Sequence, residues 1–387
     1  MLITLSTNQS YRIYAETAIL PMLPMLALVL HQPIYMTQFL IPIFLLGTVV
    51  SKFLNTFGMT NALGEKRVLL LFGFISIISS LVCLNPNIAT LLPAWFFQGV
   101  GVGVLTSITQ GLIPQAGKDF LTTLSRLRRV FIWMPLVSTF ITGFLIHYFN
   151  WQAGFIALSC FAMITWLFTL STPIKRTKII KEKKLGVLKS LSKNKLFLSY
   201  MLTISFAFSA LIVLYTMTPV IFIRDLGWPE NHYWIIIFTM TLGGFIASLI
   251  TPWCVKRFQI TQYVTLLLII GIAGGLLTVL GSLFEQTPAF IISLFVTFFL
   301  TGVSTTAALS SIRKCLHSNF ERILIIASAM LGIIQSIIAI LFSYLAAHLF
   351  RADAFDMGVL LTLTYCFSLA CFLFSLRFQA TKSSCSK

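Results

Sequence analysis

The chain has 387 residues, of which 58% are hydrophobic and only 10% are charged, and its mean hydropathy is +0.95. A soluble domain carries about a quarter charged residues to cover its surface, so this composition indicates an integral membrane protein. The formal net charge is +17. The basic residues gather in the loops on one predicted side of the membrane, so this charge does not indicate nucleic-acid binding.

Apolar runs long enough to cross a bilayer recur along the whole chain. The first six lie at roughly 12–31, 37–56, 67–84, 91–113, 130–149 and 152–171. The second six lie at roughly 197–222, 232–252, 262–284, 288–309, 322–348 and 357–377. We therefore predict an all-α integral membrane protein with twelve transmembrane helices, the first of them uncleaved. Prolines are expected to interrupt several spans, and they are Pro21, Pro24, Pro42, Pro135 and Pro219.

A polar, lysine-rich stretch separates the two sets of spans and contains a single acid, Glu182. Such a basic segment stays on the cytoplasmic side, where anionic lipid also attracts it. Of the 27 basic residues, all but Arg224 and Arg351 then face the cytoplasm. We therefore predict that the chain crosses the membrane many times and that both termini are cytoplasmic.

The order of spans and loops suggests an internal duplication. The short basic loop at Lys66–Arg67, after the second span, is matched by Lys256–Arg257 after the eighth. We expect one six-helix bundle over 1–171, the basic cytoplasmic loop over 172–196, and a second six-helix bundle with a short tail over 197–387. Two such bundles are a recurring transporter plan, with the substrate site near the midplane between them.

Residues that support catalysis or metal binding are scarce. The acids number 10, and all except Glu16 lie in loops or at span edges. The five histidines show no ligand spacing, and the seven cysteines contain no C-x-x-C pair. We therefore expect no enzyme, no cofactor and no metal site. The glycines of Gly99-x-Gly101-x-Gly103 lie inside an apolar span, which favours close helix packing, as at Gly271-xxx-Gly275.

Four short motifs occur in order in the first six spans, and they are L-P-M-L-P at 20–24, Q-x5-F-x2-G at 38–47, Q-G-V-G at 98–101 and N-W-Q-A-G-F at 150–155. Together they resemble the major facilitator drug:proton antiporters of the bicyclomycin- and chloramphenicol-resistance type. The resemblance implies the major facilitator fold, the bacterial inner membrane, a small-molecule substrate, proton coupling and a monomer. The lipid bilayer is then the protein's surroundings.

The sequence also departs from that family's pattern. The loop after the second span is a degraded form of G-x-x-x-D-R-x-G-R-R. Trp95 stands in place of the fourth-span arginine, and the fifth-span G-P-x-x-G-G reads S-T-F-I-T-G at 138–143. The family's first-span acid falls at Thr17, with Glu16 beside it. These departures leave the transport direction and the proton coupling open.

Glu16 is the acid that we place within a span. It either pairs with Arg12 one turn away or binds a proton or substrate, and both remain open. Gln98 and Thr109 are three turns apart and point the same way on the fourth span. Thr297, Thr301 and Thr305 form a hydroxyl stripe on the tenth span, where bonding to backbone carbonyls competes with a functional role. The resemblance places spans one, four, seven and ten around the cavity. The coupling candidates are Glu16 and Arg12, and the cavity candidates are Gln98, Thr109, Tyr215, Thr301, Thr305 and Gln335.

Four histidines fall at the predicted non-cytoplasmic edge, and they are His31, His147, His232 and His348. Such positions suit an amphipathic ring, and they also allow a response to external acidity.

Three functions follow. The first is a secondary transporter that moves a small organic molecule by alternating access, with proton-driven multidrug or metabolite efflux implied by the resemblance. The second is an importer of a nutrient or siderophore, because the fifth-span antiporter signature is missing. The third is a membrane sensor or accessory protein that has lost transport.

Overall fold

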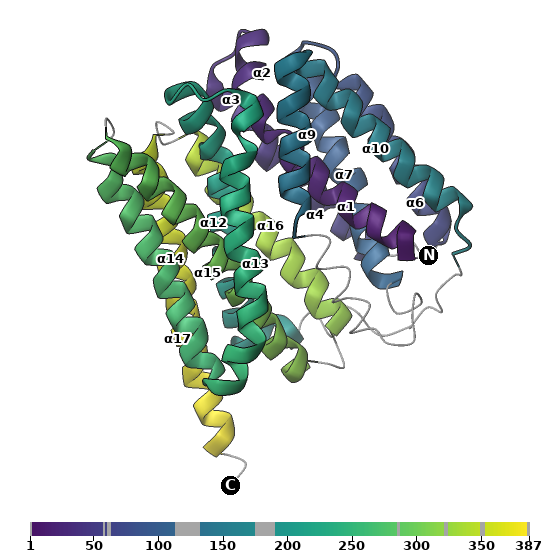
Figure 1. Ribbon diagram of the computed structural model, residues 1–387. Helices are drawn as coiled ribbons and strands as arrows, with labels where there is room; N and C mark the ends of the chain where they lie inside the picture. Colours follow the sequence, from purple (N-terminus) through teal and green to yellow (C-terminus); the bar gives the residue numbers. More distant parts are fainter. Residues whose placement is uncertain are drawn as a thin grey trace. The chain divides into compact units, whose positions relative to one another are not determined.

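The computed structural model describes residues 2–56, 59, 63–112, 132–174, 190–284, 287–320, 324–348 and 353–384. Within these ranges the chain is helical and contains no strand, and Figure 1 shows the helices running alongside one another within each part of the chain. The centre of the basic loop, 175–189, lies outside the described residues, as does most of the degraded motif after the second span.

The chain divides into two compact units. The first comprises Met1–Ile180 together with Thr218–Ile237, and the second comprises Lys181–Met217 and Phe238–Lys387. The stretch Thr218–Ile237 groups with the first unit, where part of it packs on the fifth predicted span. The predicted division into bundles at 171 and 196 stays a prediction.

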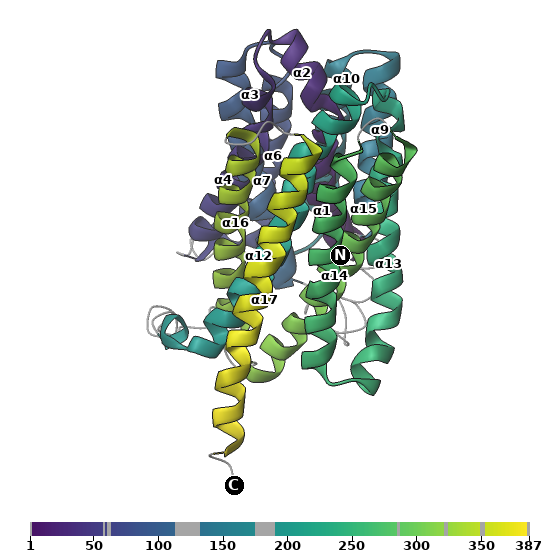
Figure 2. The same ribbon diagram turned by 90° about the vertical axis from the view of Figure 1, so that its left-hand side faces the viewer.

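The elements of the first unit are α1 (Leu2–Ala18), η1 (Leu20–Met22), α2 (Leu23–Val29), α3 (Ile34–Gln38), α4 (Leu40–Thr56), α6 (Glu65–Val82), α7 (Ile88–Leu112), α9 (Met134–Tyr148), α10 (Trp151–Ser171), η3 (Val220–Asp225) and η4 (Glu230–His232). Helices α12 (Lys195–Pro219) and α13 (Trp234–Arg257) each begin in one unit and end in the other. The second unit contains α14 (Ile260–Ser282), α15 (Pro288–Phe320), α16 (Leu324–His348) and α17 (Ala354–Ser384). Figures 1 and 2 both show the last turns of α17 extending past the end of α14.

Ten helical segments of the described residues are long and apolar enough to cross a bilayer. Two further helices complete the set. Helix α9 has 15 residues, and α6 has 18 and begins with Glu65, Lys66 and Arg67. Together these segments account for the twelve predicted spans. Large apolar side chains such as Leu71 and Phe74 of α6 are about half exposed, as expected of a surface that faces lipid.

Prolines shape the spans in two ways. The first span is interrupted as predicted, because Pro21 lies in the 3-10 turn η1 that separates α1 from α2. Pro135 instead lies in the first turn of α9, where its missing N–H costs no hydrogen bond. Pro219 ends α12, and the π-helical turn η3 follows it.

Glycines bring helix pairs into backbone contact, as the G-x-x-x-G spacing predicts. A Cβ on Gly99 of α7 would lie 2.1 Å from the carbonyl oxygen of Phe44 of α4, and one on Gly47 would lie 2.2 Å from that of Phe96. In the second unit, a Cβ on Gly275 of α14 would lie 2.5 Å from the Thr362 hydroxyl of α17. Neither contact has room for a side chain.

Candidate functional site

Helix α1 carries an unusual number of polar side chains for a membrane helix. It packs against α7, α9 and α10 in the first unit. The Asn8 side chain donates to the Thr109 hydroxyl over 3.5 Å, and the Gln9 side chain donates to the Thr106 carbonyl over 3.2 Å. Both α1 side chains are buried. The beginning of α1 is therefore held to α7 by polar contacts.

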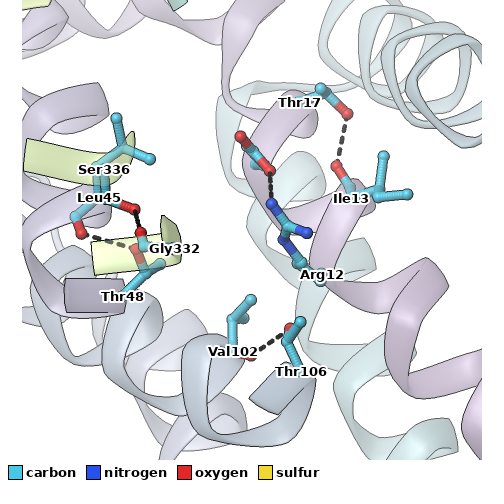
Figure 3. A network of polar contacts seen from close by, with 10 residues as sticks. Arg12, Ile13, Thr17, Leu45, Thr48, Val102, Thr106, Gly332 and Ser336 are labelled. Carbon is cyan, nitrogen blue, oxygen red and sulfur yellow. Dashed lines mark hydrogen bonds and ion pairs between the residues drawn. The ribbon is translucent and has the colours of Figure 1, made fainter. Parts of the chain in front are cut away.

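Arg12 and Glu16 form the predicted pair one turn apart on α1. The Arg12 Nη2 atom lies 3.5 Å from Glu16 Oε2, and Figure 3 shows Arg12 with this contact as a dashed line. The Arg12 side chain is 37% exposed, whereas that of Glu16 is only 13% exposed. Glu16 is thus a mostly buried carboxylate with a basic neighbour on its own helix.

A second basic side chain lies near this pair, and sequence reasoning missed it. Lys52 of α4 is half-buried and lies within electrostatic range of both Arg12 and Glu16. It belongs to the span predicted over 37–56 but is not among the predicted site residues. A lysine inside a predicted span is itself a functional candidate, and this is the signal that could have found Lys52.

Gln98 and Thr109 both face α1, as their three-turn spacing predicts. The Gln98 side-chain amide donates to the Tyr11 hydroxyl, and its carbonyl accepts from Ser80 over 3.4 Å. Thr109 is the partner of Asn8. Both residues are fully buried, so here they join helices within the first unit. Their assignment to a substrate cavity stays a prediction.

Trp95 fills the position of the family's fourth-span arginine. It is buried and lies against Phe44 of α4 and Phe155 of α10, with ring centroids 5.6 and 5.9 Å apart. Its indole N–H is buried without a hydrogen-bond partner in the described structure. An arginine's charge is therefore replaced by an aromatic contact, which brings no positive group toward Glu16.

The threonine stripe of α15 is hydrogen-bonded mainly to neighbouring helices. Thr297 donates to the carbonyl of Gly274 on α14 over 2.9 Å, and the Thr305 hydroxyl lies 2.8 Å from that of Tyr365 on α17. The Thr301 hydroxyl is buried without a partner in the part of the chain described, while its carbonyl accepts from Tyr365 over 3.5 Å. Sequence reasoning did not single out Tyr365, whose signal is a phenol inside an apolar span.

The remaining candidates also lie in the second unit. Tyr215 of α12 and Gln335 of α16 are 4% and 9% exposed. Four predicted site residues thus fall in each unit. Within the units, the structure brings Arg12 to Glu16 and brings both Thr301 and Thr305 to Tyr365.

Neither a metal centre nor the groove between α6 and α7 offers an alternative site. Among the residues that the structure describes, no three acids, histidines or cysteines gather to hold a metal ion. A groove of about 440 Å³ between α6 and α7 is lined mostly by apolar side chains, including Ile75, Ile78 and Phe97. Because Ile78 and Phe97 are about half exposed, this groove opens on the surface of the unit. It contains none of the predicted site residues.

The family model described as Major Facilitator Superfamily matches residues 8–322. The chain belongs to this superfamily. Its members are transporters, so the protein is a multi-pass membrane transporter rather than an enzyme.

Individual relatives support the more specific resemblance that the motifs predicted. The chain is 23% identical over 255 residues to the chloramphenicol resistance protein CraA of Acinetobacter baumannii, a match that covers 64% of this chain and 62% of that protein. It is 23% identical over 277 residues to a bicyclomycin resistance protein homolog of Haemophilus influenzae, covering 68% of each. The matched region thus spans about two thirds of the curated relatives' length.

Solved structures show the same fold. A D-xylose-proton symporter superimposes with a TM-score of 0.75 over 97% of this chain and 96% of its own, at 15% identity. A bacterial metal transporter does so with a TM-score of 0.65 over 98% of both chains, at 14% identity. At such identities the likeness concerns the fold alone, and it confirms the predicted major facilitator architecture.

Proposed function

We propose that this chain exports a small organic molecule from the cytoplasm in exchange for protons, by alternating access, and that Glu16 carries the proton. The observation that carries the proposal is the mostly buried carboxylate of Glu16 beside Arg12 on a membrane-spanning helix. Ionisable groups inside spans are costly and commonly belong to ion or substrate pathways.

The surroundings of Glu16 suit a group that gains and loses a proton. The Glu16 carboxylate is mostly buried, lies 3.5 Å from Arg12 and is within electrostatic range of Lys52. A small movement of α1 relative to α4 would change the electrostatic surroundings of this carboxylate, because Coulomb energies in a low-dielectric site fall steeply with distance. Protonation of Glu16 would free Arg12 from its partner, and a bound cationic substrate would do the same by pairing with the carboxylate.

Efflux is favoured by the relatives whose names record drug resistance. A chain that removes chloramphenicol or a similar lipophilic drug needs a largely apolar binding surface with few polar groups. The buried hydroxyls and amides of Gln98, Thr109 and Thr305 are polar groups of this kind. In the second unit we propose the same role for Tyr215, Thr301 and Gln335.

Import is the second candidate, because residues 138–143 lack the antiporter signature. In this stretch Ser138 bonds to Thr17 and Gly143 lies against Glu230, so the fifth span makes its own set of contacts here. A sensor or accessory role is the third candidate.

Transport in oriented vesicles separates these candidates. Inside-out vesicles with an acidic lumen, loaded with the purified protein, should accumulate chloramphenicol or a lipophilic cation, and a protonophore should abolish the accumulation. Uptake confined to right-side-out vesicles would instead establish an importer. No uptake of drugs, sugars or siderophores in either orientation, by a protein that remains folded, would overturn transport and favour the sensor.

A further inference from the structure

One end of α9 packs on η4, a short turn that follows the basic loop in the sequence by more than a full span. In the described structure α9 and η4 belong to the same unit. Gly143 permits the contact, because a Cβ at this position would lie 2.5 Å from the carbonyl oxygen of Glu230 and 3.5 Å from the Cα of Asn231. The backbone of η4 therefore rests directly on α9.

An ion pair closes the end of this contact. The Nδ1 atom of His147 lies 3.6 Å from Oε2 of Glu230, and the two side chains are 37% and 28% exposed. His147 is four residues from Gly143, so the two share one face of α9. At this exposure both side chains are in contact with the surrounding solution.

Aromatic contacts and a hydroxyl pair continue the contact from Gly143 toward the beginning of α9. The rings of Phe140 on α9 and Trp234 on α13 meet edge to face, with centroids 5.9 Å apart. The neighbouring Tyr233 is fully buried, and its hydroxyl lies 2.7 Å from that of Thr218. Phe140, Gly143 and His147 thus form a continuous contact strip along two turns of α9.

The charged groups near His147 leave Glu230 as the acid that faces it. Helix α10 and η1, which pack on α9, contain no charged residue. On α1, Arg12 and Glu16 pair with each other. They lie near the other end of α9, since Ser138 contacts Thr17 and is nine residues, about 13 Å, from His147. Arg224 pairs with Asp225 at 2.6 Å, and His232 is the second titratable side chain of η4.

We propose that the α9–η4 contact is a closure at the non-cytoplasmic end of the protein, and that the His147–Glu230 pair strengthens this closure in acid. The inference rests on the proposed transport function and on the predicted topology, which puts both residues outside. The predicted bundles place α9 in the first bundle and η4 in the second. Alternating access by rocking of one bundle against the other requires elements of the two bundles that meet on the outer side to separate once per cycle.

The sign of the pH dependence follows from the two side chains. Histidine and glutamate carry opposite charges together only between their ordinary titration ranges, near pH 4.3 and 6.5 in model peptides. The pair therefore forms around pH 5 and is lost as the pH rises to 8, because histidine becomes neutral. An exposed pair shifts an equilibrium by about two- to fivefold. External acid thus favours the closed outer end, and substrate binding must overcome the His147–Glu230 pair to open it.

Distances between two spin labels test the closure without any substrate. Tyr148 of α9 is 61% exposed and His232 of η4 is exposed, so cysteines at these positions accept labels in a background whose seven native cysteines are changed to serine. In liposomes, the ratio of short to long distances should fall about two- to fivefold between pH 5 and pH 8. His147→Gln and Glu230→Gln should each abolish this change, whereas the control His348→Gln should keep it.

A variant with a bulky side chain at position 143 gives a second test of the closure, and this test does not depend on pH. Gly143→Val should increase the long-distance population at every pH, because its side chain meets the Glu230 carbonyl. The acid-strengthened pair would be refuted if the ratio of short to long distances did not change with pH in the parent protein. It would also be refuted if this ratio changed equally in His147→Gln. Unchanged short distances in a folded Gly143→Val would refute the closure. Neither result depends on drug transport, so the failure of the closure is distinguishable from the failure of the proposed function.

Discussion

The hydroxyl of Thr17 on α1 is hydrogen-bonded to the hydroxyl of Ser138 on α9. Thr17 is the position at which the resembling antiporters carry their first-span acid, so in this chain two neutral groups meet there. Glu16 does not substitute for it in space, because adjacent residues point about 100° apart around a helix. Any proton coupling through α1 therefore uses the face on which Glu16 meets Arg12.

Glu16→Gln should abolish gradient-driven transport while leaving substrate binding and gradient-independent exchange measurable. The amide keeps the shape of the side chain but cannot gain and lose a proton. Transport in vesicles with and without a pH gradient, together with substrate binding to the purified variant, checks this. The control is Asp225→Asn, an exposed acid that pairs with its neighbour Arg224. Parental transport with unchanged proton dependence in Glu16→Gln would make the residue structural.

Arg12→Gln should shift the pH optimum of transport upward without abolishing activity. The substitution removes a positive charge 3.5 Å from Glu16, and that charge favours the ionised carboxylate. Lys52→Met should shift the optimum in the same direction, because Lys52 acts on the same carboxylate. The measurement is the initial rate of transport against pH. An optimum that moves downward in either variant would contradict the assignment.

Gly99→Ala should destabilise the protein by about 1–3 kcal/mol, because the added methyl lies 2.1 Å from the Phe44 carbonyl and forces α4 and α7 apart. Thermal unfolding in detergent measures the loss as a lower melting temperature. Gly274→Ala on α14 is the matched control, since its nearest neighbour would be a side-chain atom at 3.5 Å, an ordinary contact. Equal melting temperatures for the two variants would show that α4 and α7 can separate freely.

Both termini and the basic loop should face the cytoplasm. A cysteine that replaces Lys184, in the part of the loop outside the described residues, should resist a membrane-impermeant reagent in intact cells and react in inside-out vesicles. The matched control is a cysteine in place of Arg224, one of the two basic residues predicted outside, which should react in intact cells. The reverse pattern would overturn the topology and the outer location of His147.

Hydropathy predicted the spans well because apolar length is the signal that a bilayer demands. It failed at the beginning of the chain, where the first span was expected at 12–31 but α1 begins at Leu2. The polar side chains there looked unsuited to a membrane helix. They are accommodated because distant helices satisfy them, as Thr4 is by Thr172 at 2.6 Å and Asn8 is by Thr109. Such pairings are tertiary and leave no local pattern.

The candidate site could be predicted only where its contacts are local. The Arg12–Glu16 pair follows from helical spacing, and so does the common direction of Gln98 and Thr109. In contrast, Tyr365 bonds to Thr305 from 60 residues away, and Lys52 approaches Glu16 from another helix. Spacing along the sequence holds no information about either partner.

The reciprocal glycine contacts of α4 and α7 have a mechanical consequence. Because the carbonyls of Phe44 and Phe96 each press on a glycine of the opposite helix, sliding or tilting between these helices meets backbone atoms rather than yielding side chains. Helices α4 and α7 must then move as one rigid body, so Lys52 on α4 keeps a fixed distance from Gln98 on α7. Helix α1 packs on α7 and is bonded to it through Asn8 and Gln9, so any movement of α1 relative to this rigid pair would change the distance between Glu16 and Lys52.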